Sequence, residues 1–275
     1  MKYYSTLLNF LVMKERHLIV RSRNTSCKEL RSLMITKRVI YRMGSTTPTE
    51  AITKRKDYIE INSPEACAIS GDKILMKKAF VENNVPTAEY IDITDINNED
   101  LHQQLFEHFT EWGKMIVKHK HSSKGNGIYF IDNEEKFWEF IENTQNLKNY
   151  IFEKYYTYSK EYRLHVNKYG CFYACRKMLK NDAEVRWHRH ENNSVWILEE
   201  NPMFDKPNNW DDIVKSCIDA MNAVGLDVAA VDVKTQTNTQ NPKYIILETN
   251  SAPALGNIGI EKYKQMLTDY IYGQE

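Results

Sequence analysis

The chain has 275 residues, of which 42% are hydrophobic and 12% aromatic, and this composition excludes an intrinsically disordered protein. Lysine plus arginine and aspartate plus glutamate both number 37, so a zero net charge argues against a membrane-surface binder or a general nucleic-acid binder. The apolar run at residues 7–12 is far shorter than the roughly 20 residues that span a bilayer, and five irregularly spaced cysteines fit reduced thiols, so we expect a cytoplasmic protein.

The N-terminal region, residues 1–70, predicts a short and incomplete α/β unit. Residues 17–20 and 38–41 have the composition of strands, and they lie on either side of a helical stretch at 27–34. A loop containing glycine, serine, threonine and proline follows at 44–48.

Helices and strands alternate through the rest of the chain, which predicts a mixed α/β architecture. The first of these elements is a helix from Asp72 to Asn83, with Ile74, Leu75, Ala79 and Phe80 on its apolar face. Further expected helices lie around 101–109 and at 134–143 and 210–224. Expected extended segments are strands at 88–93, 115–117 and 150–153, a hairpin at 119–131, and strands near 162–167, 171–178, 195–198, 228–234 and 243–249.

Two late strands carry side chains that are suited to a metal ion. Asp232 interrupts an otherwise apolar strand, while Glu248 and Asn250 end the next strand, two residues apart and therefore on one face. A carboxylate within an apolar run is costly unless it has a partner. Two carboxylates and an amide oxygen suit Mg²⁺ shared with substrate phosphates, with Mn²⁺ as an alternative. The competing interpretation is a strand-end acid beside an ordinary Asn-Ser-Ala-Pro turn.

A second feature is a lysine at a strand end, Lys118, followed by a turn rich in serine and glycine. Glycines let the backbone approach a phosphate closely, and unpaired N–H groups in such a turn bind anions. The segment after the turn looks extended rather than helical, which separates it from the P-loop pattern. A β-hairpin with solvated lysines is the alternative. The residues assigned to this candidate phosphate cradle are Ser122, Ser123, Lys124 and Gly125.

The third feature is the strand that ends near residue 154 and the linker after it. Its backbone would present hydrogen-bonding groups to an adenine, with Tyr155 or Tyr156 as a wall for the ring. Glu161 would accept from ribose hydroxyls, and Arg163, on the same face, would reach an anionic oxygen. An exposed strand with ordinary Glu/Arg alternation is the competing interpretation.

In this order, the features resemble those of the ATP-grasp carboxylate–amine ligases, particularly the ribosomal-protein-modifying glutamate ligases and similar phage-encoded proteins. The resemblance covers residues 62–275. It implies an α+β fold of ATP-grasp type, in which lobes at 71–153 and 154–275 clasp ATP after the short unit at 1–70. It also implies ATP and Mg²⁺ as cofactors, with a carboxylate substrate and an amine acceptor as partners.

The resemblance assigns roles in phosphate and metal binding. Lys73 and Lys118 match the two lysines that reach the ATP phosphates, and residues 122–127 match the loop that closes over them. The strands that carry Asp232, Glu248 and Asn250 match the magnesium-binding strands of the family.

Further assignments concern the nucleoside and the reacting group. Glu161 takes the ribose position, and Arg163 and Arg176 match arginines near the phosphates and the acyl phosphate. Arg186 is a looser match to a phosphate-binding residue. The adenine-binding hinge is matched by Glu153, Lys154, Tyr155 and Tyr156.

Two departures from the family concern the acceptor side. The region before Asn62 is shorter than the usual N-terminal domain, and around 185–190 an expected asparagine gives way to aromatic and imidazole side chains. The resemblance implies ATP-dependent ligation through an acyl phosphate. The alternatives are a small-molecule kinase on the same scaffold and a non-catalytic nucleotide-binding protein.

Overall fold

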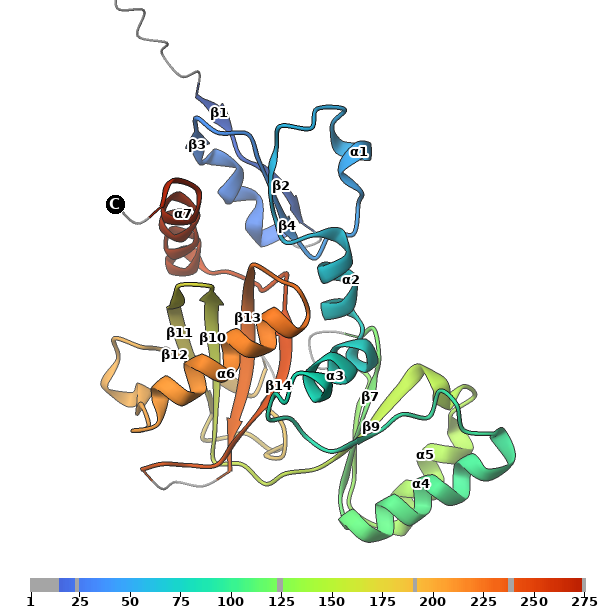
Figure 1. Ribbon diagram of the computed structural model, residues 1–275. Helices are drawn as coiled ribbons and strands as arrows, with labels where there is room; N and C mark the ends of the chain where they lie inside the picture. Colours follow the sequence, from blue (N-terminus) through green and yellow to red (C-terminus); the bar gives the residue numbers. More distant parts are fainter. Residues whose placement is uncertain (1–14, 23–24, 123–125, 190–191, 237–239, 274–275) are drawn as a thin grey trace, which may run out of the picture.

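The structure, a computed structural model, describes residues 15–22, 25–122, 126–189, 192–236 and 240–273 (Figure 1). Three sheets in chain order define an N-terminal unit, an N-lobe and a C-lobe, and a short two-stranded pair accompanies the first. The expected mixed architecture is confirmed, and most expected elements lie within a few residues of their positions in the structure.

The N-terminal unit is built on a parallel three-stranded sheet of order β2-β4-β5. Its central strand is buried at every position, as expected for a parallel strand that is covered on both faces. The elements of the unit are β1 (Arg16–His17), β2 (Ile19–Ser22), η1 (Thr25–Ser32), β3 (Met34–Ile35), β4 (Val39–Met43), α1 (Thr49–Ile52) and β5 (Ile59–Ile61).

The N-lobe has an antiparallel sheet of order β6-β9-β7-β8, and helices α4 and α5 pack on one face of it (Figure 1). Two further helices, α2 and α3, connect this lobe to the N-terminal unit. The elements are α2 (Pro64–Gly71), α3 (Lys73–Glu82), β6 (Tyr90–Ile91), α4 (Asn98–Trp112), β7 (Met115–His119), β8 (Ile128–Ile131), α5 (Glu134–Asn143), η2 (Leu147–Asn149) and β9 (Tyr150–Lys154).

The C-lobe has an antiparallel sheet of order β12-β11-β10-β13-β14, with helix α6 on one face. Because α6 covers that face, the opposite face is left for polar side chains. The elements are β10 (Lys160–Asn167), β11 (Gly170–Leu179), β12 (Ser194–Leu198), η3 (Pro202–Phe204), α6 (Trp210–Ala223), β13 (Val228–Thr235), β14 (Tyr244–Asn250) and α7 (Asn257–Tyr272).

The hydrophobic cores cross the boundaries between these parts. Met76 and Phe80 of α3 belong to the core beneath the C-lobe sheet and α6, so this helix packs with the C-lobe rather than with α4 and α5. Tyr263 and Leu267 of α7 share a core with the strands of the N-terminal unit. One expectation for α3 was wrong: Leu75 is 47% exposed, and Lys77 lies on the buried side.

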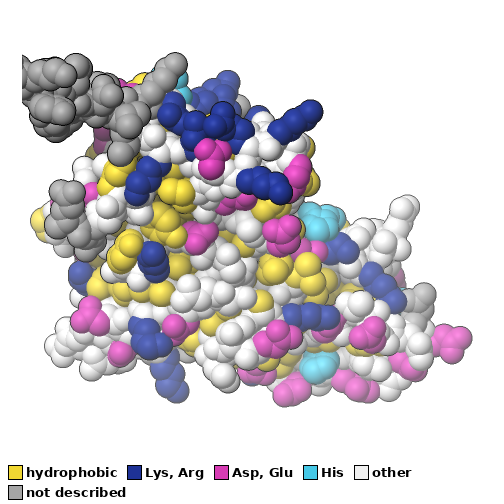
Figure 2. Space-filling model, turned by 45° about the horizontal axis from the view of Figure 1, so that its top comes forward, with side chains coloured by type: hydrophobic (Ala, Val, Ile, Leu, Met, Phe, Trp, Pro, Cys, Tyr) yellow, Lys and Arg dark blue, Asp and Glu magenta, His cyan; other side chains and the backbone are white. Residues whose placement is uncertain are grey.

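Charge is divided unevenly along the chain. The first 60 residues hold thirteen lysines and arginines against five acidic residues, and the rest holds 24 against 32. Figure 2 shows Lys and Arg side chains gathered over the end of the molecule that carries the N-terminal unit. The zero net charge therefore conceals a positive unit joined to negative lobes. None of the helices in the described ranges is long and apolar enough to cross a membrane.

Candidate active site

A row of polar side chains crosses the open face of the C-lobe sheet. Antiparallel pairing places Arg163 of β10 opposite Asp232 of β13, and Asp232 opposite Glu248 of β14. Directly opposed residues in such a ladder share a face, so these three side chains lie side by side. Asn250 is opposite Ala230, one step along the same face. The sequence-predicted metal residues and Arg163 therefore meet in the structure.

Arg163 and Asp232 form a two-pronged ion pair in the centre of this row. The Nε and Nη2 atoms of Arg163 donate to the two carboxylate oxygens of Asp232 at 2.6 and 2.8 Å. Burial alone would raise the pKa of Asp232, but the guanidinium outweighs it and holds that pKa below its ordinary value. Asp232 is thus a carboxylate with only 7% of its surface exposed, and Arg163 orients it.

The donor set around Asp232 fits a hard divalent cation. Asn250 Nδ2 lies 3.2 Å from Glu248 Oε1 and 3.5 Å from Asp232 Oδ2, which leaves the Asn250 carbonyl oxygen as an acceptor. Within the described ranges no three His, Cys, Asp or Glu side chains gather as metal ligands. Two carboxylates and one amide oxygen would form an incomplete shell, and Mg²⁺ commonly completes such a shell with water and phosphate oxygens.

A second row, parallel to the first, was only partly anticipated. Glu161 of β10 is opposite Lys177 of β11 and Lys234 of β13, and Lys177 is in turn opposite Trp196 of β12. Lys177 Nζ lies 3.7 Å from Glu161 Oε1. The Trp196 ring is 43% exposed, with Arg163 at 5.0 Å and Lys177 at 5.3 Å from its centroid. Lys177 and Trp196 are therefore site residues that the sequence did not indicate.

Arg176 is not brought to this face. It is opposite Tyr162, whose ring lies in the core beneath α6, and Arg176 Nη1 donates to the carbonyl of Met203 at 2.9 Å. Strand side chains alternate between faces, so Lys177, one residue on, occupies the face that was expected for Arg176. The physical reason is register: a shift of one residue along a strand reverses the face.

Three lysines, one on β7 and two on α3, form a cationic group around Glu153. Lys118 Nζ lies 2.7 Å from Glu153 Oε2, and Lys77 Nζ lies 3.7 Å from Glu153 Oε1. Burial would raise the pKa of Glu153, which is 3% exposed, but Lys118 and Lys77 together hold it below its ordinary value. Glu153, which was expected at the adenine, thus anchors two cations instead.

Lys77 is the most buried of these lysines and was missed by the sequence reasoning. It is 0% exposed, and burial lowers its pKa to about 8, while Glu153 partly opposes that shift. Its hydrogen bond to Thr87 completes its contacts. A usable signal existed: Lys77 lies one turn after Lys73, on the face of α3 that also carries Phe80.

Lys73 lies at the base of the glycine turn. Its Nζ donates to the carbonyl of Ser122 at 2.5 Å, and its backbone N–H donates to Lys120 at 3.2 Å. Gly127 has φ +61°, and a Cβ there would approach the His119 Cβ to 3.2 Å, so the turn requires glycine. Of the expected cradle residues, Ser123, Lys124 and Gly125 lie outside the described residues.

The expected hinge follows β9. Tyr155 packs edge-on against Phe130 at 4.8 Å. Lys154 Nζ and the Tyr156 hydroxyl both bond to Glu89 Oε1, at 2.9 and 2.7 Å, so their polar ends lie on this acid. Of the two tyrosines, Tyr155 is the one that packs on Phe130, and its role as a wall for an adenine ring stays a prediction.

The segment between β11 and β12 crosses from the C-lobe to the N-lobe. Trp187 stacks on Phe130 of β8, with ring centroids 5.2 Å apart and planes at 18°. Arg189 is 9% exposed, donates to the Ser159 carbonyl at 2.8 Å, and lies over the Tyr158 ring, while Arg186 is exposed. The structure thus fixes Arg189 against Ser159 and Tyr158, whereas Arg186, to which the sequence assigned phosphate binding, is exposed.

No protein-family model matches the sequence. A D-alanine–D-alanine ligase of Vibrio vulnificus is 34% identical over 79 residues, which are 29% of this chain and 24% of that protein. The matched region therefore spans about a quarter of the length of this curated relative.

Solved structures match over a larger part of the chain. The D-alanyl-alanine synthetase A of Vibrio cholerae superposes with a TM-score of 0.62 at 14% identity, covering 84% of this chain and 75% of that one. The ATP-grasp ligase PsnB, in complex with a phosphomimetic variant of its minimal precursor, Mg and ADP, superposes with a TM-score of 0.54 at 16% identity. That match covers 78% of this chain and 61% of PsnB. At such identities the likeness is one of fold.

Proposed function

The chain has the ATP-grasp fold, and on that premise we propose that it is an ATP-dependent carboxylate–amine ligase. The observation that carries the proposal is that Lys118 and Lys77 are paired with buried Glu153, while Asp232, Glu248 and Asn250 lie together on the C-lobe sheet. Burial lowers the pKa of Lys73 and of Lys77, and the negative charge of Glu248 opposes that shift in both, which supports a common site for these lysines and the carboxylates. Cations on one side and oxygen ligands on the other are what a triphosphate requires.

The lysines would bind and orient the phosphates of ATP. Lys118 and Lys77 are held in place by buried Glu153, so they present positive charge without the entropy loss of ordering free side chains. A Mg²⁺ ion held by Asp232, Glu248 and Asn250 would neutralise phosphate charge, and Mn²⁺ is an alternative. Arg163, which is fixed on Asp232, would place its guanidinium beside the transferring phosphoryl group.

The proposed chemistry has two steps. An oxygen of the substrate carboxylate attacks the γ-phosphorus, the bond to the bridging oxygen breaks, and ADP leaves with that electron pair. The amine then attacks the acyl carbon, phosphate leaves with the C–O pair, and the amine loses a proton as the amide forms. Water must be excluded in between, and the Trp187–Phe130 contact across the cleft supports that role for the 180–189 segment.

The test couples product identification to loss of the metal ligands. Full-length protein is incubated with Mg²⁺-ATP and pooled amino acids or cell extract, and mass spectrometry identifies an amide product formed with ADP and phosphate. Asp232→Asn and Glu248→Gln should abolish turnover while the circular dichroism spectrum is kept.

Matched controls are available on exposed helix surfaces. Asp219→Asn on α6 and Glu261→Gln on α7 remove acids whose ion pairs are with lysines on the same helix, so turnover should be unchanged. A stable phosphoester product would favour a small-molecule kinase on this scaffold. Full turnover in both metal-ligand variants would refute the proposed site.

A further inference from the structure

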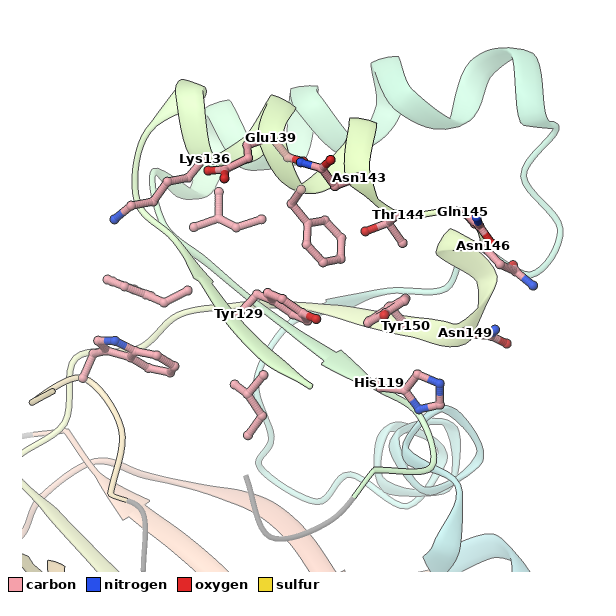
Figure 3. Close-up of a pocket in the computed structure, with 15 residues that line it drawn as sticks. His119, Tyr129, Lys136, Glu139, Asn143, Thr144, Gln145, Asn146, Asn149 and Tyr150 are labelled. Atoms are coloured by element: carbon pink, nitrogen blue, oxygen red, sulfur yellow. The ribbon is translucent and has the colours of Figure 1, made fainter. Parts of the chain in front are cut away.

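A cavity of about 790 Å³ runs along the outer edge of the N-lobe sheet (Figure 3). Strand β8 is the last strand of that sheet, and all four of its residues, Ile128 to Ile131, line the cavity. Side chains of consecutive strand residues point to opposite faces. A cavity that touches all four must therefore follow the open edge of the strand, over a length of about 13 Å.

Alternate residues of β8 bond to β7, and the backbone groups of the residues between them are directed into this cavity. The His119 N–H donates to the Gly127 carbonyl, which makes these two residues a hydrogen-bonded pair of the antiparallel ladder. Such pairs recur every second residue, so Tyr129 and Ile131 also bond to β7. The N–H and C=O groups of Ile128 and Phe130 consequently point away from β7, toward the cavity.

The walls of the cavity are aromatic at the centre and rich in amides at the rim. Figure 3 shows Tyr129 and Tyr150 across the middle, between Asn143 at the end of α5 and His119. Tyr129 is 43% exposed. On the other face of β8, Trp187 forms the wall. The rim carries side chains that both donate and accept hydrogen bonds: Asn143, Thr144, Gln145, Asn146 and Asn149.

The charge of the lining is balanced. Lys136 and Glu139 contribute one charge each, and Lys136 already pairs with Asp132 at 2.7 Å. A lining without net positive charge does not attract the phosphates of a nucleic acid. Paired main-chain donors and acceptors along a straight edge match an extended polypeptide, whose backbone offers the same groups at the same spacing.

We propose that this cavity binds an extended, uncharged polypeptide segment, which adds a strand to the edge of β8. Its backbone would bond to Ile128 and Phe130, and its side chains would alternate between the Tyr129–Tyr150 face and the Trp187 face. Because Trp187 belongs to the segment that crosses the cleft, the peptide would contact both lobes. The site is separate from the row that carries Asp232, so its occupancy does not depend on the proposed ligase chemistry.

The experiment uses a peptide array probed with the full-length protein. The array holds eight-residue peptides without Asp, Glu, Lys or Arg, and the affinity of retained peptides is measured by fluorescence anisotropy. Methylating the backbone nitrogen at every second position should weaken binding about tenfold, the loss of one or two hydrogen bonds, while the intervening positions tolerate methylation. This alternation is the signature of strand addition.

Protein variants locate the binding site. Tyr129→Ala should weaken peptide binding about tenfold, because the exposed ring forms the centre of the cavity. Tyr169→Ala is the matched control, since this ring is 49% exposed on the β10–β11 turn of the other lobe, and affinity should be unchanged. Retention of no peptide, or equal affinity of the Tyr129→Ala variant, would overturn the proposal. Displacement of bound peptide by an oligothymidylate would instead assign the edge to a nucleic acid. A wild-type dimer that the Tyr129→Ala substitution dissociates would assign it to a second copy of the chain.

Discussion

At the scale of single residues, the site is decided by which face of a strand a side chain occupies. Arg176 and Lys177 are neighbours on β11, yet Arg176 bonds to the 203–204 carbonyls and Lys177 lies beside Glu161 and Trp196. Charge and sequence position do not distinguish them. Their distinction comes from the ladder with β10, which sets the register of β11.

This placement predicts opposite phenotypes for two adjacent substitutions. Arg176→Ala should cost about 1–3 kcal/mol of unfolding free energy, because it removes the donor to the Met203 carbonyl, and turnover per folded molecule should be kept. Lys177→Ala should leave the denaturation midpoint nearly unchanged and lower turnover. Urea denaturation and initial rates measure the two effects, and a reversed pattern would refute the register argument.

Lys77 predicts a pH dependence of nucleotide affinity. Its pKa of about 8 reflects burial, which Glu153 and Glu248 oppose and Lys118 reinforces. Above pH 8 the side chain loses its proton, so the affinity for Mg²⁺-ADP should fall, by up to about tenfold per pH unit. Calorimetric titrations between pH 7 and 9 measure this fall, and Lys77→Met should bind weakly with a flatter profile. A variant with the wild-type profile would assign the titration to another group.

The lowered pKa of Lys77 has the opposite effect on folding stability, which should rise with pH. Between about pH 8 and the ordinary lysine value of 10.5, the unfolded chain keeps a proton on Lys77 that the folded protein releases. The contribution of this residue to folding free energy therefore becomes more favourable as the pH rises through that window.

At the scale of elements, the 180–189 segment joins the lobes through one aromatic stack. Trp187 on Phe130 links β8 to the C-lobe, and Phe130 in turn packs on Tyr155 of the expected hinge. An aromatic pair of this kind contributes about 0.5–1.5 kcal/mol beyond the area that it buries. The contact therefore adds only a modest free energy to the link between β8 and the C-lobe.

The stack predicts that Trp187 controls nucleotide release. Trp187→Ala should speed dissociation of a fluorescent ADP analogue about two- to tenfold, which corresponds to the loss of the stacking energy. Stopped-flow fluorescence measures the rate. Trp187→Phe retains a stacking ring and serves as the control, with a rate close to that of the wild type. Equal release from the wild type and the alanine variant would show that the segment does not retain nucleotide.

At the scale of the whole molecule, the three parts are joined by shared cores. The apolar face of α7, with Tyr263, Met266 and Leu267, packs against the N-terminal unit rather than against its own lobe alone. Asn62, which is fully buried, accepts from the backbone N–H groups of Asp227 and Val228 at 2.8 and 3.0 Å. The N-terminal unit is thus part of the fold of the C-lobe.

A truncation tests this joining. The chain 62–275 should lose cooperative unfolding and aggregate, because removing the unit exposes large apolar side chains of α7, each worth about 1.5–3 kcal/mol when buried. Size-exclusion chromatography and dye binding to exposed apolar surface report the outcome. A monomeric truncated chain with the melting temperature of the full-length protein would show that the unit is an independent attachment.

The sequence by itself determined the order of the helices and strands. It also identified charged residues that lie within or beside apolar strands, where burying a charge is costly. Periodicity located α3, α5, α6 and the late strands. A charge inside an apolar run identified Asp232, and a lysine at a strand end before a glycine turn identified Lys118. These signals are local, so neighbouring residues suffice to produce them. The metal-ligand assignment of Asp232, Glu248 and Asn250 stays a prediction, although the structure places the three together.

Only the tertiary structure decided which of those charges meet. The faces of Arg176 and Lys177, the pairing of Lys77 with Glu153, and the contact of Arg189 with Ser159 depend on registers and packing between segments far apart in the chain. The open edge of β8 also follows from sheet order. Such relations have no signal within one segment, because a strand or helix of given composition can place either neighbour inward until its partners are present.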